Sequence, residues 1–228
     1  MPGTLSIVAT PIGNLEDMTL RGIKTLKETN LVACEDTRVA AKLLAGLGLE
    51  KKPLFALHEH TDEKKIEAVI AHLLRGDNVT YISDAGTPGM NDPGGKLVEA
   101  AFEAGIPVTP LPGPSALSAV ISVCGFPMEH FSYVGFVPHK KGRETFFREL
   151  ATREESVIFL ESTHRMEKTL ESLSKTMAPS RGIFIGRELT KMHETLYRGT
   201  IDAVSKGVHA TSFKGEFIIV IAPARFKL

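Results

Sequence analysis

Two kinds of hydrophobic pattern alternate along the first half of the chain. Short runs rich in aliphatic and β-branched residues, typical of strands, are separated by longer stretches whose apolar residues recur at helical spacing. Helical spacing is clearest in Asp62–Arg75 and recurs over a shorter length in Gly95–Ala104. Each stretch is followed by a glycine, Gly76 or Gly105, and glycine favours the left-handed conformation that ends many helices. The runs that predict strands are Leu5–Ala9, Leu31–Cys34, Leu54–Leu57, Val79–Ser83 and Pro107–Pro110.

The second half repeats this alternation with different spacing. Helical periods cover Arg143–Ala151 and His164–Met177. Between residues 182 and 200, two strand-like runs follow each other with only a short connection. Such a connection indicates an antiparallel pair and therefore a mixed sheet. The runs that predict strands are Phe131–Val137, Ser156–Leu160, Gly182–Gly186, Thr195–Arg198 and Phe217–Ala222.

The alternation as a whole predicts an α/β fold. The tripeptide Pro112-Gly113-Pro114 interrupts the pattern near the middle of the 228 residues, and such breaks are typical of a domain boundary. We therefore expect an N-terminal α/β domain over residues 1–113 with a mainly parallel sheet. A C-terminal α/β domain with a mixed sheet is expected over residues 114–228.

Charge changes this picture only locally, because 27 Lys and Arg residues balance 27 Asp and Glu residues. A site for RNA would have to be a local patch of cations. The best patch is Pro138–Arg148, where cations exceed acids by 4 − 1 = 3. Its two phenylalanines, Phe146 and Phe147, are expected in the core because they fit the buried face of a helix. If the protein binds RNA, the cations that would contact it are Lys140, Lys141 and Arg143.

The sequence also indicates the compartment in which the protein works. No run approaches the ~20 apolar residues that cross a bilayer, and the N-terminus lacks the pattern of a secretory signal. The two cysteines, Cys34 and Cys124, match no metal spacing and are expected to be buried, reduced thiols. We therefore expect a cytoplasmic protein.

Three loops rich in glycine and proline follow predicted strands: Ala9–Asn14, Ser83–Gly94 and Pro112–Ala116. In open α/β sheets ligands bind beyond the carboxyl ends of strands, and glycine lets the backbone approach them closely. A phosphate-binding G-x-x-x-x-G-K-[ST] loop would need glycine at Met90 and a hydroxyl at Leu97, so that motif is absent. The loops predict a ligand site that is not a standard phosphate cradle.

Two other groups of polar residues have alternative interpretations. Glu35 and Asp36 follow the second predicted strand, where dinucleotide-binding folds hold a ribose. His58 and His60 share one face of an extended segment and could form a metal pair, but no third ligand is apparent. We therefore expect no metal.

Several motifs resemble those of the tetrapyrrole-methylase superfamily. They are similar in particular to the bacterial group that 2′-O-methylates a cytidine ribose in small-subunit (16S) rRNA. This resemblance covers nearly the whole chain, and S-D-A-G-T-P-G and R-E-L-T-K are its most specific parts. The matching stretches are Ala9–Asn14, Cys34–Arg38, Ser83–Gly94, Gly113–Ala116, Glu161–Arg165 and Arg187–Lys191.

The resemblance implies two α/β domains with S-adenosylmethionine in the cleft between them. It also implies a homodimer without metal whose partner is 16S rRNA in the small ribosomal subunit, and it moves Asp36 from a ribose-binding role to the substrate side. The implied contacts to the methyl donor are Pro11, Asp84, Ala85, Gly86, Thr87, Ser115, Ala116, Glu161, Ser162 and Gly199. The substrate-binding candidates are Asp36, Arg38, Lys140, Lys141, Arg143, Arg165 and Arg187.

Transfer of a methyl group to a ribose hydroxyl requires alignment and removal of the hydroxyl proton, for which a Lys or Glu could act as base. The R-E-L-T-K motif offers Lys191 and Glu188 as catalytic candidates. If the motif continues a strand, Arg187 and Lys191 share a face and Glu188 points away. That arrangement would lower the pKa of Lys191 and favour it as the base.

Two alternatives stay open from the sequence. The first is a methylase of a tetrapyrrole or a protein side chain, although such relatives resemble G-x-G-P-G-D where this chain has T-P-I-G-N. The second is a nucleotide-binding module without catalysis. It predicts that R-E-L-T-K can be altered without loss of activity and that no methyl acceptor exists.

Overall fold

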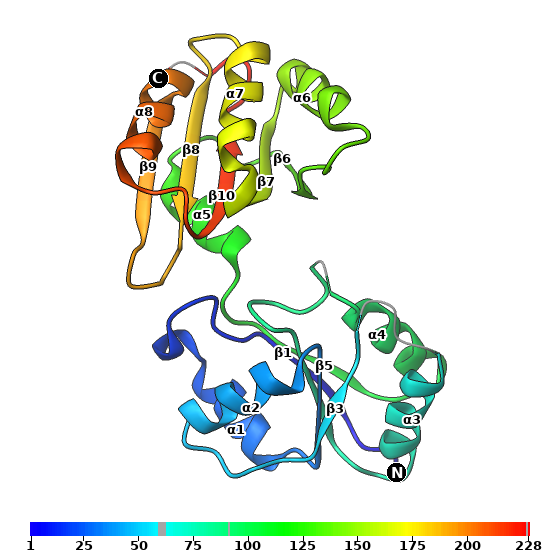
Figure 1. Ribbon diagram of the computed structural model, residues 1–228. Coiled ribbons are helices and arrows are strands. Elements are labelled where there is room, and N and C mark those ends of the chain that lie inside the picture. Colours follow the sequence, from blue (N-terminus) through cyan, green and yellow to red (C-terminus); the bar gives the residue numbers. More distant parts are fainter. Residues whose placement is uncertain (59–62, 91, 227) are drawn as a thin grey trace. The chain divides into compact units, whose positions relative to one another are not determined.

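A computed structural model describes residues 1–228 except 59–62, 91 and 227 (Figure 1). The chain forms two compact units, Met1–Ser115 and Ala116–Leu228. Each unit contains one five-stranded sheet with helices packed on it. The predicted α/β class is therefore confirmed.

The sheet of the first unit is entirely parallel. Its spatial order is β3-β2-β4-β1-β5. All residues of the central strand β4 and of its neighbour β2 are buried, as expected for a parallel sheet that is covered on both faces. The strands are β1 (Leu5–Val8), β2 (Leu31–Cys34), β3 (Leu54–Ala56), β4 (Val79–Ile82) and β5 (Val108–Leu111), each within a residue or two of its predicted position.

Within the described residues of this unit, the α-helices that cover the sheet are α1 (Leu20–Glu28), α2 (Thr37–Gly46), α3 (Glu63–Leu74) and α4 (Gly94–Glu103). Helices α3 and α4 pack on one face, and α1 and α2 pack on the other. The sequence analysis missed α1 and α2. Their signals were the capping residues Thr19 and Asp36, whose side chains accept hydrogen bonds from the first helical turn. Gly76 and Gly105 have φ values of 99° and 65°, so the predicted left-handed helix ends are confirmed.

The sheet of the second unit is mixed, with the order β6-β7-β10-β8-β9. Strands β6 and β7 are parallel, whereas β10 runs antiparallel to both β7 and β8. The predicted antiparallel pair is confirmed as β8 and β9. The strands are β6 (Phe131–Phe136), β7 (Ser156–Ser162), β8 (Gly182–Arg187), β9 (Thr195–Thr200) and β10 (Glu216–Ile221).

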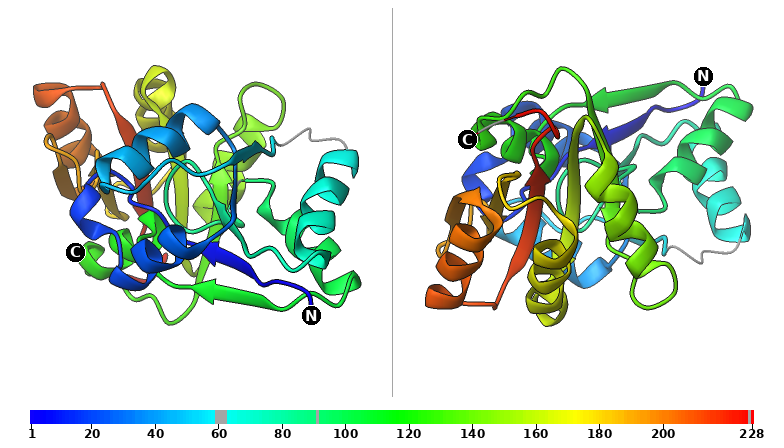
Figure 2. Two further views of the ribbon diagram at one scale, coloured as in Figure 1. Left: turned by 90° about the horizontal axis from the view of Figure 1, so that it is seen from below. Right: turned by 90° about the horizontal axis from the view of Figure 1, so that it is seen from above.

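The helices of this unit are α5 (Ala116–Cys124), α6 (Arg143–Thr152), α7 (Met166–Thr176) and α8 (Ile201–Thr211). Side chains alternate along β10, so Phe217 and Ile219 pack with α6, α7 and α8 while Ile218 packs with α5 on the opposite face. Figure 2 shows helices of this unit on both sides of β10, which is drawn in red. Phe147 is buried and Phe146 is half-buried against the same core, which confirms their expected packing. The sequence analysis missed α5 and α8.

Neither membrane spans nor reactive thiols are evident in the described part of the chain. None of its helices is long and apolar enough to cross a bilayer. Cys34 and Cys124 are free and buried, as predicted. Burial, together with the nearby charges of Asp84, Asp36 and Glu35, raises the pKa of Cys34 to about 12, so this thiol stays protonated and unreactive.

Candidate functional site

The loops that follow β1, β4 and β5 gather at the carboxyl edge of the first sheet, because parallel strands end on the same side. Thr10 and Gly86 exchange two backbone hydrogen bonds of 2.9 and 3.0 Å. The Thr87 hydroxyl donates to the carbonyl of Pro114 at 3.0 Å. The first and third glycine/proline loops are therefore both tied to the second one.

The conformation and the packing at position 86 favour glycine. Its φ is 81°, which disfavours other residues, and a Cβ atom would lie 3.3 Å from the side chain of Ile12. The tight Ser83–Thr87 turn can therefore lie directly against the first loop.

Asp92 organises the other half of the long loop, a role that sequence reasoning missed. Its carboxylate accepts hydrogen bonds from the amides of Gly89, Met90 and Gly94. It also accepts one from the Tyr81 hydroxyl at 3.2 Å. This loop is thus held in shape by its own carboxylate, while the neighbouring Asn91 lies outside the described residues.

Asp84 and Asp36 bring two carboxylates together at the same edge. The Asp36 amide donates to Asp84 Oδ1 at 3.1 Å. The Asp36 side chain caps α2 and binds the guanidinium of Arg38, which lowers the pKa of Asp36. Desolvation raises the pKa of Asp84, and the negative charge of Asp36 adds to the rise although the Asp36 amide opposes it. Asp84 is the exposed carboxylate of this edge and has no arginine of its own bound to it in the described structure.

The remaining donor-side candidates have varied exposure. Ala85 is exposed and lies next to Asp84, whereas Pro11 is half-buried. Ser115 and Ala116 are half-buried at the start of α5. Gly199 is half-buried near the end of β9.

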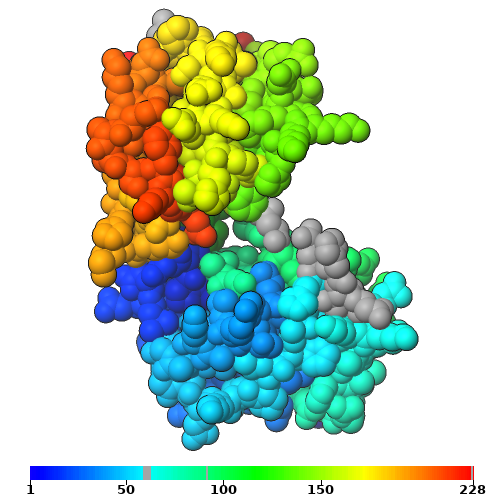
Figure 3. All heavy atoms as spheres, viewed as in Figure 1, coloured from blue at the N-terminus to red at the C-terminus, as the bar shows by residue number. Residues whose placement is uncertain are grey.

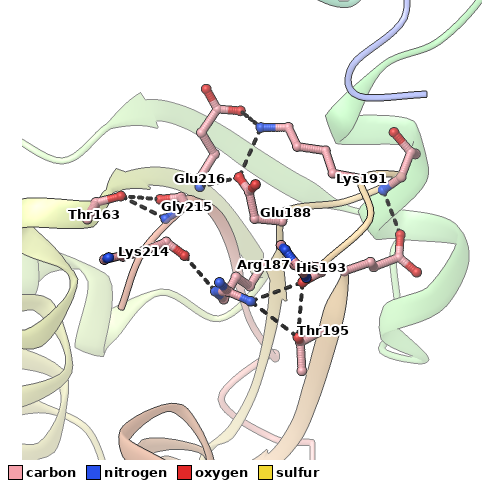
Figure 4. A network of polar contacts seen from close by, with 11 residues as sticks. Thr163, Arg187, Glu188, Lys191, His193, Thr195, Lys214, Gly215 and Glu216 are labelled. Carbon is pink, nitrogen blue, oxygen red and sulfur yellow. Dashed lines mark hydrogen bonds and ion pairs between the residues drawn. The ribbon is translucent and has the colours of Figure 1, made fainter. Parts of the chain in front are cut away.

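A second cluster of motif residues lies at one edge of the mixed sheet. The ends of β7 and β8 meet the start of β10 there, with Ser162 opposite Glu216 and Arg187 opposite Phe217. Beyond the strands, Thr163 Oγ1 is 2.6 Å from the Gly215 carbonyl and 2.9 Å from its amide (Figure 4). The E-S-T-H-R and R-E-L-T-K motifs are therefore joined through the segment that precedes β10.

The prediction that R-E-L-T-K continues a strand is wrong. Strand β8 ends at Arg187, and the chain then turns through positive φ values of 53° at Glu188 and 65° at Thr190. These are uncommon for residues other than glycine. Lys191 Nζ is brought 2.9 Å from Glu188 Oε1, so Glu188 points toward Lys191 rather than away from it (Figure 4).

Lys191 is held between two carboxylates, since its Nζ is also 2.9 Å from Glu216 Oε2. Burial by itself would lower the pKa of Lys191, but the hydrogen bonds and charges of Glu216 and Glu188 outweigh it and raise the pKa. Glu188 is ionised, because the Glu216 amide and Lys191 overcome its desolvation and lower its pKa. The expected lowering of the Lys191 pKa is therefore wrong, and its amine is an ammonium in this arrangement.

Arg187 does not have the exposure expected of an RNA contact. The residue is 8% exposed, and its guanidinium donates to the carbonyls of Lys214 at 2.7 Å and His193 at 3.0 Å (Figure 4). These two bonds join the end of β8 to the segment before β10 and to the segment that follows the R-E-L-T-K turn. The structure therefore gives Arg187 a supporting position.

Glu161 also lies inside the second unit. Its side chain is fully buried and ion-paired with Arg165 at 2.8 Å and with Arg143 at 3.4 Å. These three residues were expected to contact the donor or the RNA, but their charged groups are used within the protein. The missed partner is Thr169, whose hydroxyl donates to Glu161 at 2.6 Å.

Lys140 and Lys141 remain exposed, as does Arg148 in α6. The segment that carries them and helix α6 form part of the outer surface of the second unit, shown in light green in Figure 3. Because Arg143 is paired with Glu161, the cationic surface of this segment comes from these three residues.

No group of three or more metal-ligating side chains occurs among the residues that the structure describes. The pair His58 and His60 lies only partly within them, because residues 59–62 are outside the described chain.

Comparison with known proteins gives the family. A family model described as Tetrapyrrole (Corrin/Porphyrin) Methylases matches residues 4–205. A protein of Xylella fastidiosa named Ribosomal RNA small subunit methyltransferase I is 43% identical over 98% of this chain and 82% of its own length. Proteins of the same name from Escherichia coli O157:H7 and Thermotoga maritima are 41% and 39% identical, covering 77% and 98% of their own lengths and 96% of this chain in both cases.

Solved structures share the fold at much lower identity. A uroporphyrin-III-C-methyltransferase from Thermus thermophilus aligns with a TM-score of 0.65 at 20% identity, covering 96% of this chain and 94% of that one. A cobalt precorrin-4 methyltransferase aligns with a TM-score of 0.71 at 14% identity over the same shares. The order of the two sheets, the motif loops and these matches together show that the chain belongs to the tetrapyrrole methylase family.

Proposed function

We propose that this protein transfers the methyl group of S-adenosylmethionine to the 2′-hydroxyl of a cytidine ribose in small-subunit 16S rRNA. The observation that carries the proposal is the 39–43% identity, over nearly the whole chain, to proteins named Ribosomal RNA small subunit methyltransferase I. The choice of the 2′-hydroxyl as acceptor, and of cytidine as the nucleoside, comes from the resemblance in sequence motifs. A homodimer in the cytoplasm is part of the same proposal.

The carboxyl-edge loops of the first unit offer the donor side. Asp84 provides an exposed carboxylate for the polar or cationic parts of the donor. The small, exposed side chain of Ala85 leaves the backbone next to Asp84 open to a ligand. We place Pro11, Asp84–Thr87 and Ser115 here, and a solved neighbour at 19% identity has been described in complex with S-adenyl homocysteine. Ser162 and Gly199 remain donor-side predictions.

S-adenosylmethionine supplies a cationic sulfonium whose methyl carbon is open to in-line attack. The chain has to orient the ribose oxygen and the donor, and alignment of this kind can contribute most of the rate enhancement. We assign Lys191 to the acceptor side as a fixed ammonium that attracts the nucleotide phosphate. Glu188 orients it through their 2.9 Å ion pair.

The direct test is incubation with labelled S-adenosylmethionine and small ribosomal subunits that lack the modification. We expect label in a cytidine ribose, and donor binding by calorimetry that is unchanged in excess chelator. Label in a tetrapyrrole or protein acceptor instead would support the first alternative. Donor binding without any acceptor would support a non-catalytic module.

Replacing Asp84 with asparagine is expected to weaken donor binding without destabilising the protein. The raised pKa means that the folded state disfavours the charged form, so this carboxylate costs stability above its pKa and the cost disappears below it. Asparagine keeps an oxygen for the Asp36 amide and removes the charge. Calorimetry and thermal unfolding at neutral pH measure the two effects, and unchanged donor affinity would remove Asp84 from the site.

The double substitution Lys140→Glu and Lys141→Glu is expected to raise the KM for subunits and to leave donor affinity unchanged. Both residues are exposed on the segment before α6. Each lost phosphate contact should reduce the slope of log affinity against log salt by about 1. Arg148→Glu, one turn into the same helix, shows how far the contact extends. A wild-type salt slope in the double variant would place the RNA contact elsewhere.

A further inference from the structure

Glu161 lies near the end of β7 with every side-chain oxygen occupied. Oε1 accepts the Ser162 amide at 2.8 Å and lies 2.8 Å from Arg165 Nη2. Oε2 accepts the Thr169 hydroxyl at 2.6 Å and a weaker contact from Arg143 Nη1 at 3.4 Å. The carboxylate is completely buried, whereas the Arg143 and Arg165 side chains are 15% and 14% exposed.

The two arginines also bind the backbone immediately before the basic segment. Arg165 Nη1 donates to the carbonyl of Val137 at 2.7 Å. Arg143 Nη1 reaches the carbonyl of Pro138 at 3.4 Å. Val137 and Pro138 follow β6, and only His139 lies between Pro138 and Lys140. The Val137 amide also donates to the Leu160 carbonyl at 3.3 Å, and Arg143 Nη2 donates to the Thr169 hydroxyl at 2.7 Å. Together with these bonds, Glu161 holds, through its arginines, the root of the segment that carries Lys140 and Lys141.

The segment has few anchors of its own among the described contacts. Residues 139–142 are exposed, and α6 begins after Gly142, which has a φ of 85° and makes no side-chain cap. The Arg143 amide donates a backbone hydrogen bond of 3.3 Å to the Lys140 carbonyl. The position of the two lysines consequently depends on what holds Val137 and Pro138.

Stability alone is a weak reason for such an ionic group. Taking charges out of water is costly, and buried ion pairs can often be replaced by apolar residues without loss of stability. A buried carboxylate with two guanidinium groups does, however, fix direction and distance, because guanidinium forks bind in defined geometry.

We propose that Glu161 is a positioning residue for RNA binding, acting through Arg143 and Arg165 on the segment that carries Lys140 and Lys141. The proposal rests on the proposed function in one respect, namely that these lysines contact RNA. It assigns Glu161 to the acceptor side, in place of the donor contact expected from the sequence.

Site-specific proteolysis tests the positioning itself, without any RNA. Under native conditions Glu161→Gln should speed tryptic cleavage after Lys140 and Lys141 about tenfold, because the segment opens locally more often. Arg181→Met is the matched control, since Arg181 is also a buried arginine bound to backbone carbonyls, those of Ala151, Arg153 and Ala222. It holds the other end of α6 and should not change this cleavage. Equal cleavage in Glu161→Gln and the wild type would overturn the proposal.

Kinetics with small subunits test the consequence for function. Glu161→Gln should raise the KM for subunits with little change in the KM for the donor, and Arg143→Lys should do so more mildly. In the variant that already carries Lys140→Glu and Lys141→Glu, Glu161→Gln should raise the KM for subunits little further, because the effects of coupled residues are not additive.

A rise in the donor KM instead, or full additivity, would overturn the acceptor-side assignment. If the wild type methylates no subunit, the proposed function fails, while the proteolysis result still decides whether Glu161 positions the segment.

Discussion

Replacing Lys191 with methionine is expected to lower turnover by ~10²–10³-fold, the usual loss when one preorganised electrostatic contact is removed. Methionine keeps much of the side-chain length but not the charge. Glu188 and Glu216, each 2.9 Å from the lysine nitrogen, would lose the cation that holds them together. Donor binding should persist because Lys191 lies on the acceptor side. Single-turnover kinetics and donor calorimetry separate these effects.

Replacing Lys191 with arginine tests whether Lys191 acts as a fixed positive charge or as a general base. The structure holds the lysine as an ammonium with a raised pKa, so we expect arginine to retain much of the turnover that methionine loses. For the same reason the rate should not rise through a lysine ionisation between about pH 6 and 9. An inactive arginine variant, together with a rate that rises as an amine ionises, would show that Lys191 acts as a neutral base.

Glu216→Gln provides the matched control. The Glu216 side chain is 84% exposed, so its removal should cost little stability while it lowers the raised pKa of Lys191. If Lys191 is a cation, turnover near neutral pH should stay the same or fall slightly. Faster turnover at neutral pH in this variant would favour the base.

Glu161→Gln is expected to have the largest effect on stability, lowering the free energy of unfolding of its unit by about 3–5 kcal/mol, as found when one partner of a buried ion pair is removed. The glutamine would leave Arg143 and Arg165 facing each other without their shared carboxylate. It would also leave the Ser162 amide and the Thr169 hydroxyl with poorer acceptors. Denaturant unfolding measured with several probes is required, because two units need not unfold in one step.

The comparison for this prediction is Glu28→Gln, which removes an exposed pair with Lys24 at 4.0 Å and should have no measurable effect. Thr169→Val removes one neutral hydrogen bond to Glu161 and should fall between the two. A Glu161→Gln protein as stable as the wild type would mean that solvent reaches the two arginines after the change.

The glycine/proline loops and the strands were predictable because their signals are local. The strands of the described residues lie close to the runs that predicted them, and each glycine/proline loop directly follows a strand. The missed helices have weak local signals. In α5, Ala116–Cys124 is apolar nearly all round, so no helical period stands out, and α1 has only a few apolar residues among its charges.

By itself the sequence determined the α/β class, the motif loops and the family. Hydrophobic period, turn residues and motif spacing are properties of residues close together in the chain, so they can be recognised without the structure. Only the tertiary structure decided what the charged motif residues do. Gly215 leaves room for the Glu188 side chain, because a Cβ atom at position 215 would lie only 2.5 Å from it. In this position Glu188 forms its ion pair with Lys191. Arg143, at the start of α6, reaches Glu161 in strand β7. Burial and the pairing of charges depend on segments far apart in the chain, and no local pattern records which of them will meet.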